Sequence, residues 1–245
     1  MALHFVTDDA AAAAVGDVVE LTGAEAHHAA AVRRVRAGEP VTLGDGRGTW
    51  LDGTCETVEP KLVRVRVVAR RQEPAATPRI VLVQALAKGG RDELAVQATT
   101  ELGADLIVPW QAARSVSRWD AAKAAKGRAR WQTIVREAAK QAHRAWIPDV
   151  AEVASTADIA ALAAASRVFV LDPTGDVPLS GLTPAADDPR DIVLVVGPEG
   201  GIAPDEIDRL RRAGASIAVL GDTVLRTSTA GPAALAVVST RVGRW

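Results

Sequence analysis

The chain has 245 residues, of which 48% are hydrophobic and 24% charged, and its formal net charge at pH 7 is −1. These values are typical of a globular protein with one large or two modest domains, and no apolar run reaches the length of about 18 residues that a membrane span needs. The single cysteine, Cys55, excludes an internal disulfide and a cysteine-cluster metal site, and the histidines form no metal-binding helical pattern. Without a secretion signal at the N-terminus, the expected location is the cytoplasm.

The first 70 residues predict a small, mostly β module. Turn glycines interrupt residues 41–58, with a hairpin turn expected at 44–48, and LVRVRVV (62–68) alternates apolar with basic side chains as a strand does. EAHHAAAVRRVR (25–36) predicts one helix. The stretch RRQEPAATPR (70–79) contains two prolines and no periodicity, so it reads as a linker. We therefore expect domains at 1–73 and 74–245.

From Ile80 onward, apolar strands alternate with helices. The strands are predicted at 80–86, 105–110, 167–172, 191–197 and 216–221, and the helices at 92–102, 128–146, 204–214 and 229–243. Buried strands that alternate with helices indicate an α/β domain with a mostly parallel sheet. Trp131 falls on the apolar side of its helix, which favours a core position over a base-stacking platform.

The near-neutral total hides one strongly basic segment. Residues 111–147 carry nine Lys and Arg against two acids, whereas 148–245 carry eight against thirteen. Such a local patch can hold a polyanion although the pI is near 6.4.

Two glycine-containing loops follow predicted strands. GPEGG (197–201) lies between a strand and a helix, where ligands bind in open parallel sheets. It lacks the Lys and Ser/Thr of a phosphate loop, so it suits a ligand read through the backbone; a tight strand-to-helix turn is the alternative. LGDTVLRTSTA (220–230) follows the next strand. Thr227, Ser228 and Thr229 are helix N-cap candidates, whereas Arg226 is unusual because a helix N-terminus repels a cation.

These loops resemble those of the RsmE family of ribosomal RNA methyltransferases in the SPOUT superfamily. Other stretches share the resemblance: ALAKG (85–89), TELG (100–103), RWQ (130–132), EAAKQAHRAWIP (137–148) and HHAAAVRRVRAGE (27–39). The resemblance covers nearly the whole chain. It implies a PUA-like β-barrel at the N-terminus and a SPOUT-type domain with a deep trefoil knot. It also implies methylation of a uridine at N3 in small-subunit (16S) ribosomal RNA, with S-adenosylmethionine as cofactor.

The resemblance further implies a homodimer that acts on small-subunit ribosomal RNA, in an assembled or nearly assembled 30S particle, without metal or membrane. The cofactor site it implies is formed by Leu171, Gly197, Pro198, Glu199, Gly200, Gly201, Leu220, Gly221, Leu225, Arg226 and Ala230. Where the family often has LRTET, this chain has Ser228 in place of the glutamate. A SPOUT enzyme for transfer RNA or large-subunit RNA, or a non-catalytic RNA-binding protein, are the alternatives.

Basic residues are candidates for binding the RNA backbone. They are Arg33, Arg34, Arg36, Arg114, Arg118, Arg128, Arg130, Arg136, Lys140 and Arg144. Each of the first three, taken alone, fits a plain surface arginine better than a phosphate contact. Glu137, Gln141 and Arg144 recur at the spacing of one helix face, which usually indicates a solvated surface. The family resemblance favours a role at the active site or dimer interface instead.

Methyl transfer to uracil N3 requires loss of the N3 proton. Arg226 is the candidate catalytic residue, since its charge would stabilise the uracil anion; a structural ion pair is the alternative. The residues do not single out a base.

Overall fold

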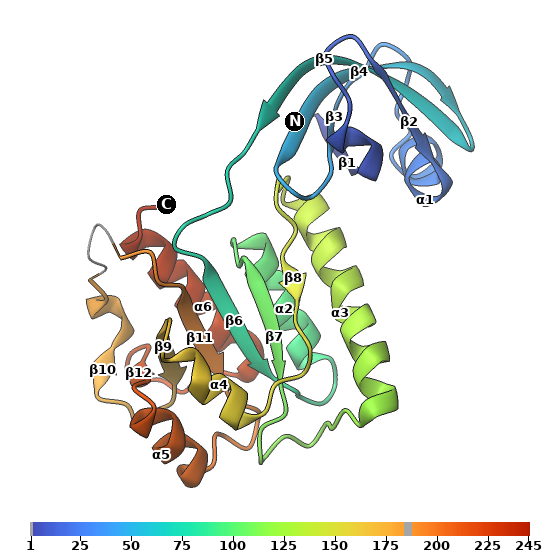
Figure 1. Cartoon of the computed structure of the whole chain (residues 1–245). Coiled ribbons are helices and arrows are strands. Elements are labelled where there is room, and N and C mark those ends of the chain that lie inside the picture. Colours follow the sequence, from blue (N-terminus) through green and yellow to red (C-terminus); the bar gives the residue numbers. More distant parts are fainter. Residues whose placement is uncertain (1, 184–187) are drawn as a thin grey trace. The chain divides into compact units, whose positions relative to one another are not determined.

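The structure is a computed structural model that describes residues 2–183 and 188–245, and the chain forms two compact units (Figure 1). The first unit runs to Ala75 and also contains Ala139–Ile147. The second unit contains Ala76–Ala138 and Pro148–Trp245. Sequence reasoning placed 139–147 in the C-terminal domain, whereas the structure packs this segment with the first unit.

The first unit is built on a five-stranded sheet with the order β1-β3-β4-β5-β2. Its strands are β1 (Leu3–Val6), β2 (Val18–Thr22), β3 (Pro40–Gly44), β4 (Thr49–Glu59) and β5 (Leu62–Gln72), and the short helix η1 (Asp8–Ala11) follows β1. β1 and β3 are parallel, and the other neighbours are antiparallel. The hairpin between β3 and β4 and the alternating strand at 62–68 are confirmed. Cys55 lies in the core of this unit, and burial raises the pKa of its thiol to about 11.

The single helix expected over 25–36 is wrong. The structure has α1 (Gly23–His27) and then one π-helical turn, η2 (His28–Val32). Arg34 has a φ of 54°, and this left-handed backbone cannot continue a right-handed helix. Arg33, Arg34 and Arg36 therefore lie in an exposed loop.

The segment Ala139–Ile147 is tied to the first unit by main-chain and side-chain contacts. Gly48 N–H donates to Ala145 O at 3.0 Å, and Ile147 N–H donates to Gly46 O at 3.0 Å. The indole N–H of Trp146 donates to Glu73 O at 2.9 Å. These bonds extend the edge of the β module with a piece of chain that is distant in the sequence.

His4 forms a buried aromatic contact within this unit. Its ring stacks on Trp50 at 4.4 Å between centroids, and its Nδ1 lies 2.9 Å from the Thr42 hydroxyl. Burial, followed by the positive charges of His143 and Lys140, lowers the pKa of His4 to about 4. The imidazole is therefore neutral at pH 7 and behaves as a packing group.

The second unit is built on a seven-stranded sheet with the order β10-β12-β9-β11-β6-β7-β8. Its strands are β6 (Ile80–Ala85), β7 (Leu106–Trp110), β8 (Asp149–Val150), β9 (Arg167–Leu171), β10 (Val177–Pro178), β11 (Ile192–Val196) and β12 (Ser216–Val219). All neighbouring pairs are parallel, so the predicted parallel α/β sheet is confirmed. The crossing of loops into a trefoil knot stays a prediction.

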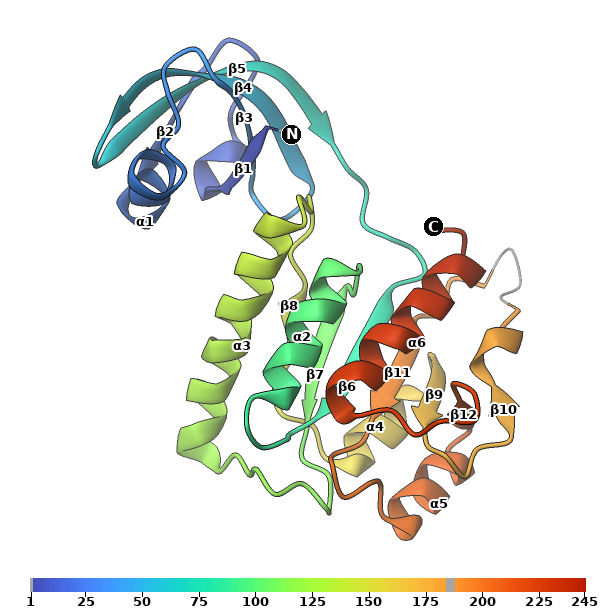
Figure 2. The same ribbon diagram turned by 180° about the vertical axis from the view of Figure 1, so that it is seen from behind.

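Helices cover both faces of this sheet (Figures 1 and 2). On one face lie α2 (Arg91–Glu101), α3 (Ala121–Gln141), α6 (Thr227–Arg241) and the short η3 (Leu179–Gly181), and on the other lie α4 (Thr156–Leu162) and α5 (Pro204–Arg212). Each face has its own apolar core. Within the described ranges, we find no helix whose length and apolar character would let it cross a bilayer.

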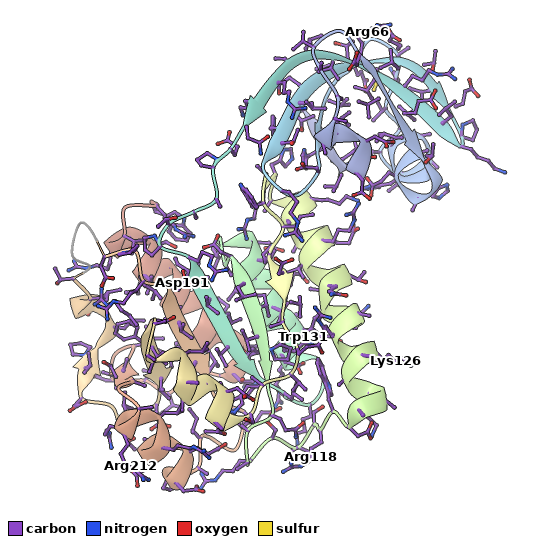
Figure 3. The ribbon with its side chains drawn as sticks, viewed as in Figure 1. Arg66, Arg118, Lys126, Trp131, Asp191 and Arg212 are labelled. Carbon is purple, nitrogen blue, oxygen red and sulfur yellow. The ribbon has the colours of Figure 1, made fainter. Side chains whose placement is uncertain are left out.

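α3 confirms the core position of Trp131 and corrects the bounds of the helix. Trp131 points from α3 toward the sheet and is 1% exposed, whereas Lys126 points away from it (Figure 3). The helix spans Ala121–Gln141 rather than 128–146. It ends before the predicted residue because His143 has a φ of 54°. Arg144 therefore lies beyond the helix, and it does not share a helix face with Glu137 and Gln141.

Candidate functional site

The carboxyl ends of β12, β9, β11 and β6 lie side by side at one edge of the parallel sheet. A cavity of about 410 Å³, here called the glycine-loop cavity, opens at this edge. It is lined by Arg91, Leu171, Asp172, Pro173, Val196, Gly197, Pro198, Glu199, Gly201, Ile202, Val224, Leu225, Arg226, Thr227 and Ala230. Its position and volume are those of a small-molecule site in an open α/β sheet.

A second cavity, of about 350 Å³, adjoins the first. The two share Leu171, Asp172, Pro173, Val224, Leu225 and Ala230, and the second adds the β12 loop with Leu220 and Gly221. The loops at 197–201 and 220–230 thus line two adjoining cavities at the same edge of the sheet. Gly200 lines neither cavity: it is exposed, and a Cβ added to it would lie closest to Arg114.

Two positions in the glycine loop require glycine. A Cβ on Gly197 would lie 2.6 Å from Cγ1 of Ile202, which is itself buried. Gly201 has a φ of 70°, and its N–H donates to Pro198 O at 2.9 Å to close the turn. At these two positions the loop therefore presents backbone rather than a side chain to the cavity.

Glu199 fastens the glycine loop to the loop that follows β6. Its Oε1 accepts hydrogen bonds from Lys88 N–H and from the Arg91 guanidinium, each at 3.1 Å. Burial raises the pKa of Glu199, but bonds from its own backbone and from Lys88, together with Arg91, outweigh burial and leave the pKa lowered. The carboxylate is thus charged at neutral pH and part of the cavity wall.

Arg226 is the residue that immediately precedes α6, and it lines the glycine-loop cavity. Within the described part of the chain, its guanidinium has no ion pair, so the alternative of a structural ion pair finds no partner there. α6 begins at Thr227, and no side chain caps it. Thr227, Ser228 and Thr229 are therefore inside the first turn, and the expected capping role for them is wrong.

Sequence reasoning missed Arg91 and Asp172 in the cavity wall. Asp172 directly follows β9, and its Oδ1 accepts from the N–H and hydroxyl of Thr174 at 2.9 and 2.7 Å. Arg91 begins α2 directly after the turn formed by Gly89 and Gly90, both of which have positive φ. The available signals were weak: Asp172 is the polar last residue of the strand predicted at 167–172, and Arg91 lies between the strand predicted at 80–86 and the helix predicted at 92–102.

The loop after β7 contributes Arg114 and Arg118. Arg114 Nη1 donates to Gly200 O at 3.2 Å, so this arginine contacts the glycine loop itself. Arg118 Nη2 donates to Ala113 O at 3.1 Å. Both side chains remain exposed, and both stay candidates for binding the RNA backbone.

Several other basic candidates are already paired with acids. Arg128 binds Glu152 at 2.7 Å, and Arg130 binds Glu93 at 3.0 Å. The prediction that Lys140 binds the RNA backbone is wrong. Its side chain is 6% exposed and its ammonium lies 2.7 Å from Glu25, so it is a buried structural charge rather than a phosphate contact. Arg136 and Arg144 are partly buried.

Comparison with known proteins identifies the family. A model for an RNA methyltransferase PUA domain matches residues 21–68, which confirms the PUA-like module, and a model for an RNA methyltransferase domain matches residues 74–239. The chain is 44% identical to the Ribosomal RNA small subunit methyltransferase E of Mycobacterium bovis, over 94% of this chain and 89% of that protein. It is 31% identical to the protein of the same name from Bacillus subtilis, over 89% and 88%.

Solved structures agree with the sequence relatives. The fold matches a Legionella pneumophila putative methyltransferase in complex with SAM at a TM-score of 0.85, with 28% identity and 98% of both chains covered. It matches a Ribosomal RNA small subunit methyltransferase E from Neisseria gonorrhoeae bound to S-adenosyl methionine at 0.84, with the same identity and coverage. The chain therefore belongs to the ribosomal RNA small subunit methyltransferase E family.

Proposed function

We propose that this chain transfers the methyl group of S-adenosylmethionine (SAM) to N3 of a uridine in small-subunit ribosomal RNA. The observation that carries the proposal is the glycine-loop cavity at the carboxyl edge of the sheet, where the glycine loop and Arg226 face the same space. Membership of the family, and the SAM in the related solved structures, support the cofactor and the RNA class. The choice of uridine N3 rests on the family resemblance.

The cavity residues fit this cofactor. Leu171, Leu225 and Ala230 offer apolar surface for a purine ring, and the bare backbone at Gly197 and Gly201 allows close approach. Asp172 and Glu199 supply carboxylate oxygens that accept hydrogen bonds from amino and hydroxyl groups. SAM supplies a methyl group on a positively charged sulfur, activated for transfer to a nucleophile.

The chain itself would align the two reactants and manage charge. SAM would supply the methyl group, the loops of the chain would hold it against N3, and the N3 proton would leave to a base. The loops hold the geometry and exclude water, which supplies much of the rate in such displacements. Arg226 would stabilise the negative charge that develops on the uracil.

Calorimetric titration with SAM, followed by mass mapping of ribosomal RNA from a strain that lacks the gene, tests the proposal. We expect the chain to bind SAM, and we expect one uridine of the small-subunit RNA to lack a methyl group until active enzyme is added. Transfer to transfer RNA or large-subunit RNA would favour another SPOUT activity. Cofactor binding without transfer to any RNA would contradict the proposed enzyme.

We also propose that the enzyme is a cytoplasmic homodimer that acts on the assembled or nearly assembled 30S particle. The resemblance to the family suggests the dimer, and exposed apolar side chains on the second unit support it. Leu94 in α2, Val116 in the loop after β7 and Val224 in the loop after β12 are 58%, 67% and 77% exposed. Sedimentation at assay concentration tests the dimer, and an active monomer would contradict it.

Replacing Arg33, Arg34 and Arg36 together with glutamine should weaken RNA binding. Within the described residues their guanidinium groups have no ion pair, so all three charges are available to phosphates. Three lost phosphate contacts at about 0.7 each should lower the slope of log Kd against log salt by about 2. Filter binding of small-subunit RNA over a range of salt concentrations measures this slope.

The matched control replaces Arg128 and Arg130, whose charges are paired with Glu152 and Glu93. It should change the slope less per charge removed. An equal effect per charge in both variants would mean that the loop at 33–36 has no special part in RNA binding.

A further inference from the structure

A buried chain of hydrogen bonds lies beneath the glycine-loop cavity and joins β6, β11 and α6. The side-chain amide of Gln84 donates to the Thr227 hydroxyl at 3.0 Å, and that hydroxyl donates to Gly197 O at 2.7 Å. Gln84 is 0% exposed and Thr227 is 7% exposed. Gln84 lies beside Val196 in the register of β6 and β11, so all three groups meet where these strands end.

The chemistry of the groups determines which of them donates and which accepts in each hydrogen bond. A threonine hydroxyl has one proton, which Gly197 O receives, so Thr227 must accept from the NH₂ of Gln84. The other amide proton goes to Ala85 O at 3.1 Å. If the amide were flipped, its NH₂ group would lose the hydrogen bonds to the Thr227 hydroxyl and to Ala85 O. As a result, Gln84 Oε1 is buried, with no partner among the residues that the structure describes.

An unsatisfied buried oxygen costs stability, and an apolar side chain of similar size would avoid that cost. Gln84 occupies a strand position whose neighbours on the same face, Leu82 and Leu86, are core residues. Packing alone therefore favours leucine at this position. What glutamine adds is the donor that holds the Thr227 hydroxyl in place.

Gly197 and Thr227, which these hydrogen bonds join, both belong to the cavity wall. Gly197 is the first residue after β11, and Thr227 directly follows Arg226. Gly231 brings the start of α6 close to the sheet, since a Cβ there would lie 3.0 Å from Cδ1 of Leu82. The network thus ties the loop before α6 to the glycine loop across the floor of the cavity.

We propose that Gln84 and Thr227 are positioning residues that hold Gly197 and Arg226 in register for cofactor binding and methyl transfer. The role rests on the proposed function. Gln84 does not line the cavity and acts through the Thr227 hydroxyl, whereas Thr227 lies in the cavity wall and acts through its bond to Gly197 O.

Thr227→Val removes the hydroxyl and keeps the shape of the side chain. We expect SAM affinity and single-turnover rate each to fall by about tenfold or more, and Thr227→Ser to restore both. The matched control is Thr229→Val, two residues further along α6, where the threonine is exposed. Calorimetry with SAM and methylation of small-subunit particles give the two readouts.

Gln84→Leu separates positioning from structural support. We expect its melting temperature to equal or exceed that of the wild type, while its affinity for SAM and its rate fall. A purely structural glutamine would instead show activity lost only in parallel with the melting temperature, which would overturn the role. Wild-type behaviour of Thr227→Val and Gln84→Leu would also overturn it. A wild-type chain that fails to bind SAM would overturn the proposed function first, and the role with it.

Discussion

Arg226→Ala should lower the single-turnover rate of methyl transfer by at least about two orders of magnitude, the typical loss for one preorganised electrostatic group. Arg226 lines the cavity directly before α6, and within the described residues no carboxylate pairs with it. Its charge is therefore available to stabilise a uracil that is losing its N3 proton. The assay uses saturating SAM and small-subunit particles, so that weaker cofactor binding does not enter the measured rate.

Ser228→Ala is the matched control for this variant. A serine hydroxyl is far too weak a base at neutral pH to take the uracil proton, and Ser228 does not cap α6. The rate should therefore change by no more than a few-fold. A dead Ser228→Ala enzyme beside an active Arg226→Ala enzyme would reverse this assignment of roles.

Gly197→Ala should reduce SAM affinity by at least about tenfold in a chain that remains folded. The new Cβ would lie 2.6 Å from Cγ1 of Ile202, and Ile202 is 4% exposed within the core between the sheet and α5. Because Ile202 has little room to move, the loop itself must shift, and overpacking of this kind costs about 1–3 kcal/mol. Calorimetry with SAM measures the affinity, and circular dichroism checks the fold.

Gly200→Ala is the control from the same loop. Its Cβ would lie 3.4 Å from the nearest atom, Arg114 Cβ, and its backbone is not left-handed. SAM affinity should stay close to that of the wild type. If Gly200→Ala loses the cofactor while Gly197→Ala retains it, the cavity wall has been placed on the wrong side of the loop.

The order of strands and helices in the second unit was predictable because its buried parallel strands are continuous apolar runs punctuated by glycine and proline. The cavity was predictable in part for the same reason: glycine loops directly after strands indicate ligand sites. Its floor was not. Gln84 and Thr227 are separated by 143 residues, and Gln84 differs from its apolar neighbours in a way that strand periodicity cannot interpret.

Charge was the least predictable property. Lys140 looks like any surface lysine of a basic helix, and only the fold brings it to Glu25, 115 residues earlier in the chain. Arg34 likewise fits a helical pattern in sequence, yet its left-handed backbone ends the helix. In both cases a long-range or conformational constraint decides the role of a residue whose type alone fits a phosphate contact.

The docking of Ala139–Ile147 on the first unit sets an order for folding during synthesis. When the ribosome has released only the first 75 residues, Glu25 has no lysine partner and Glu73 O has no indole donor, because Lys140 and Trp146 are not yet made. Bringing residues 139–147 back to the first unit also closes a long loop of chain, and this costs conformational entropy. The N-terminal unit should therefore mature late although its strands emerge first, and a fragment ending at residue 75 should be less stable than the same unit in the whole chain.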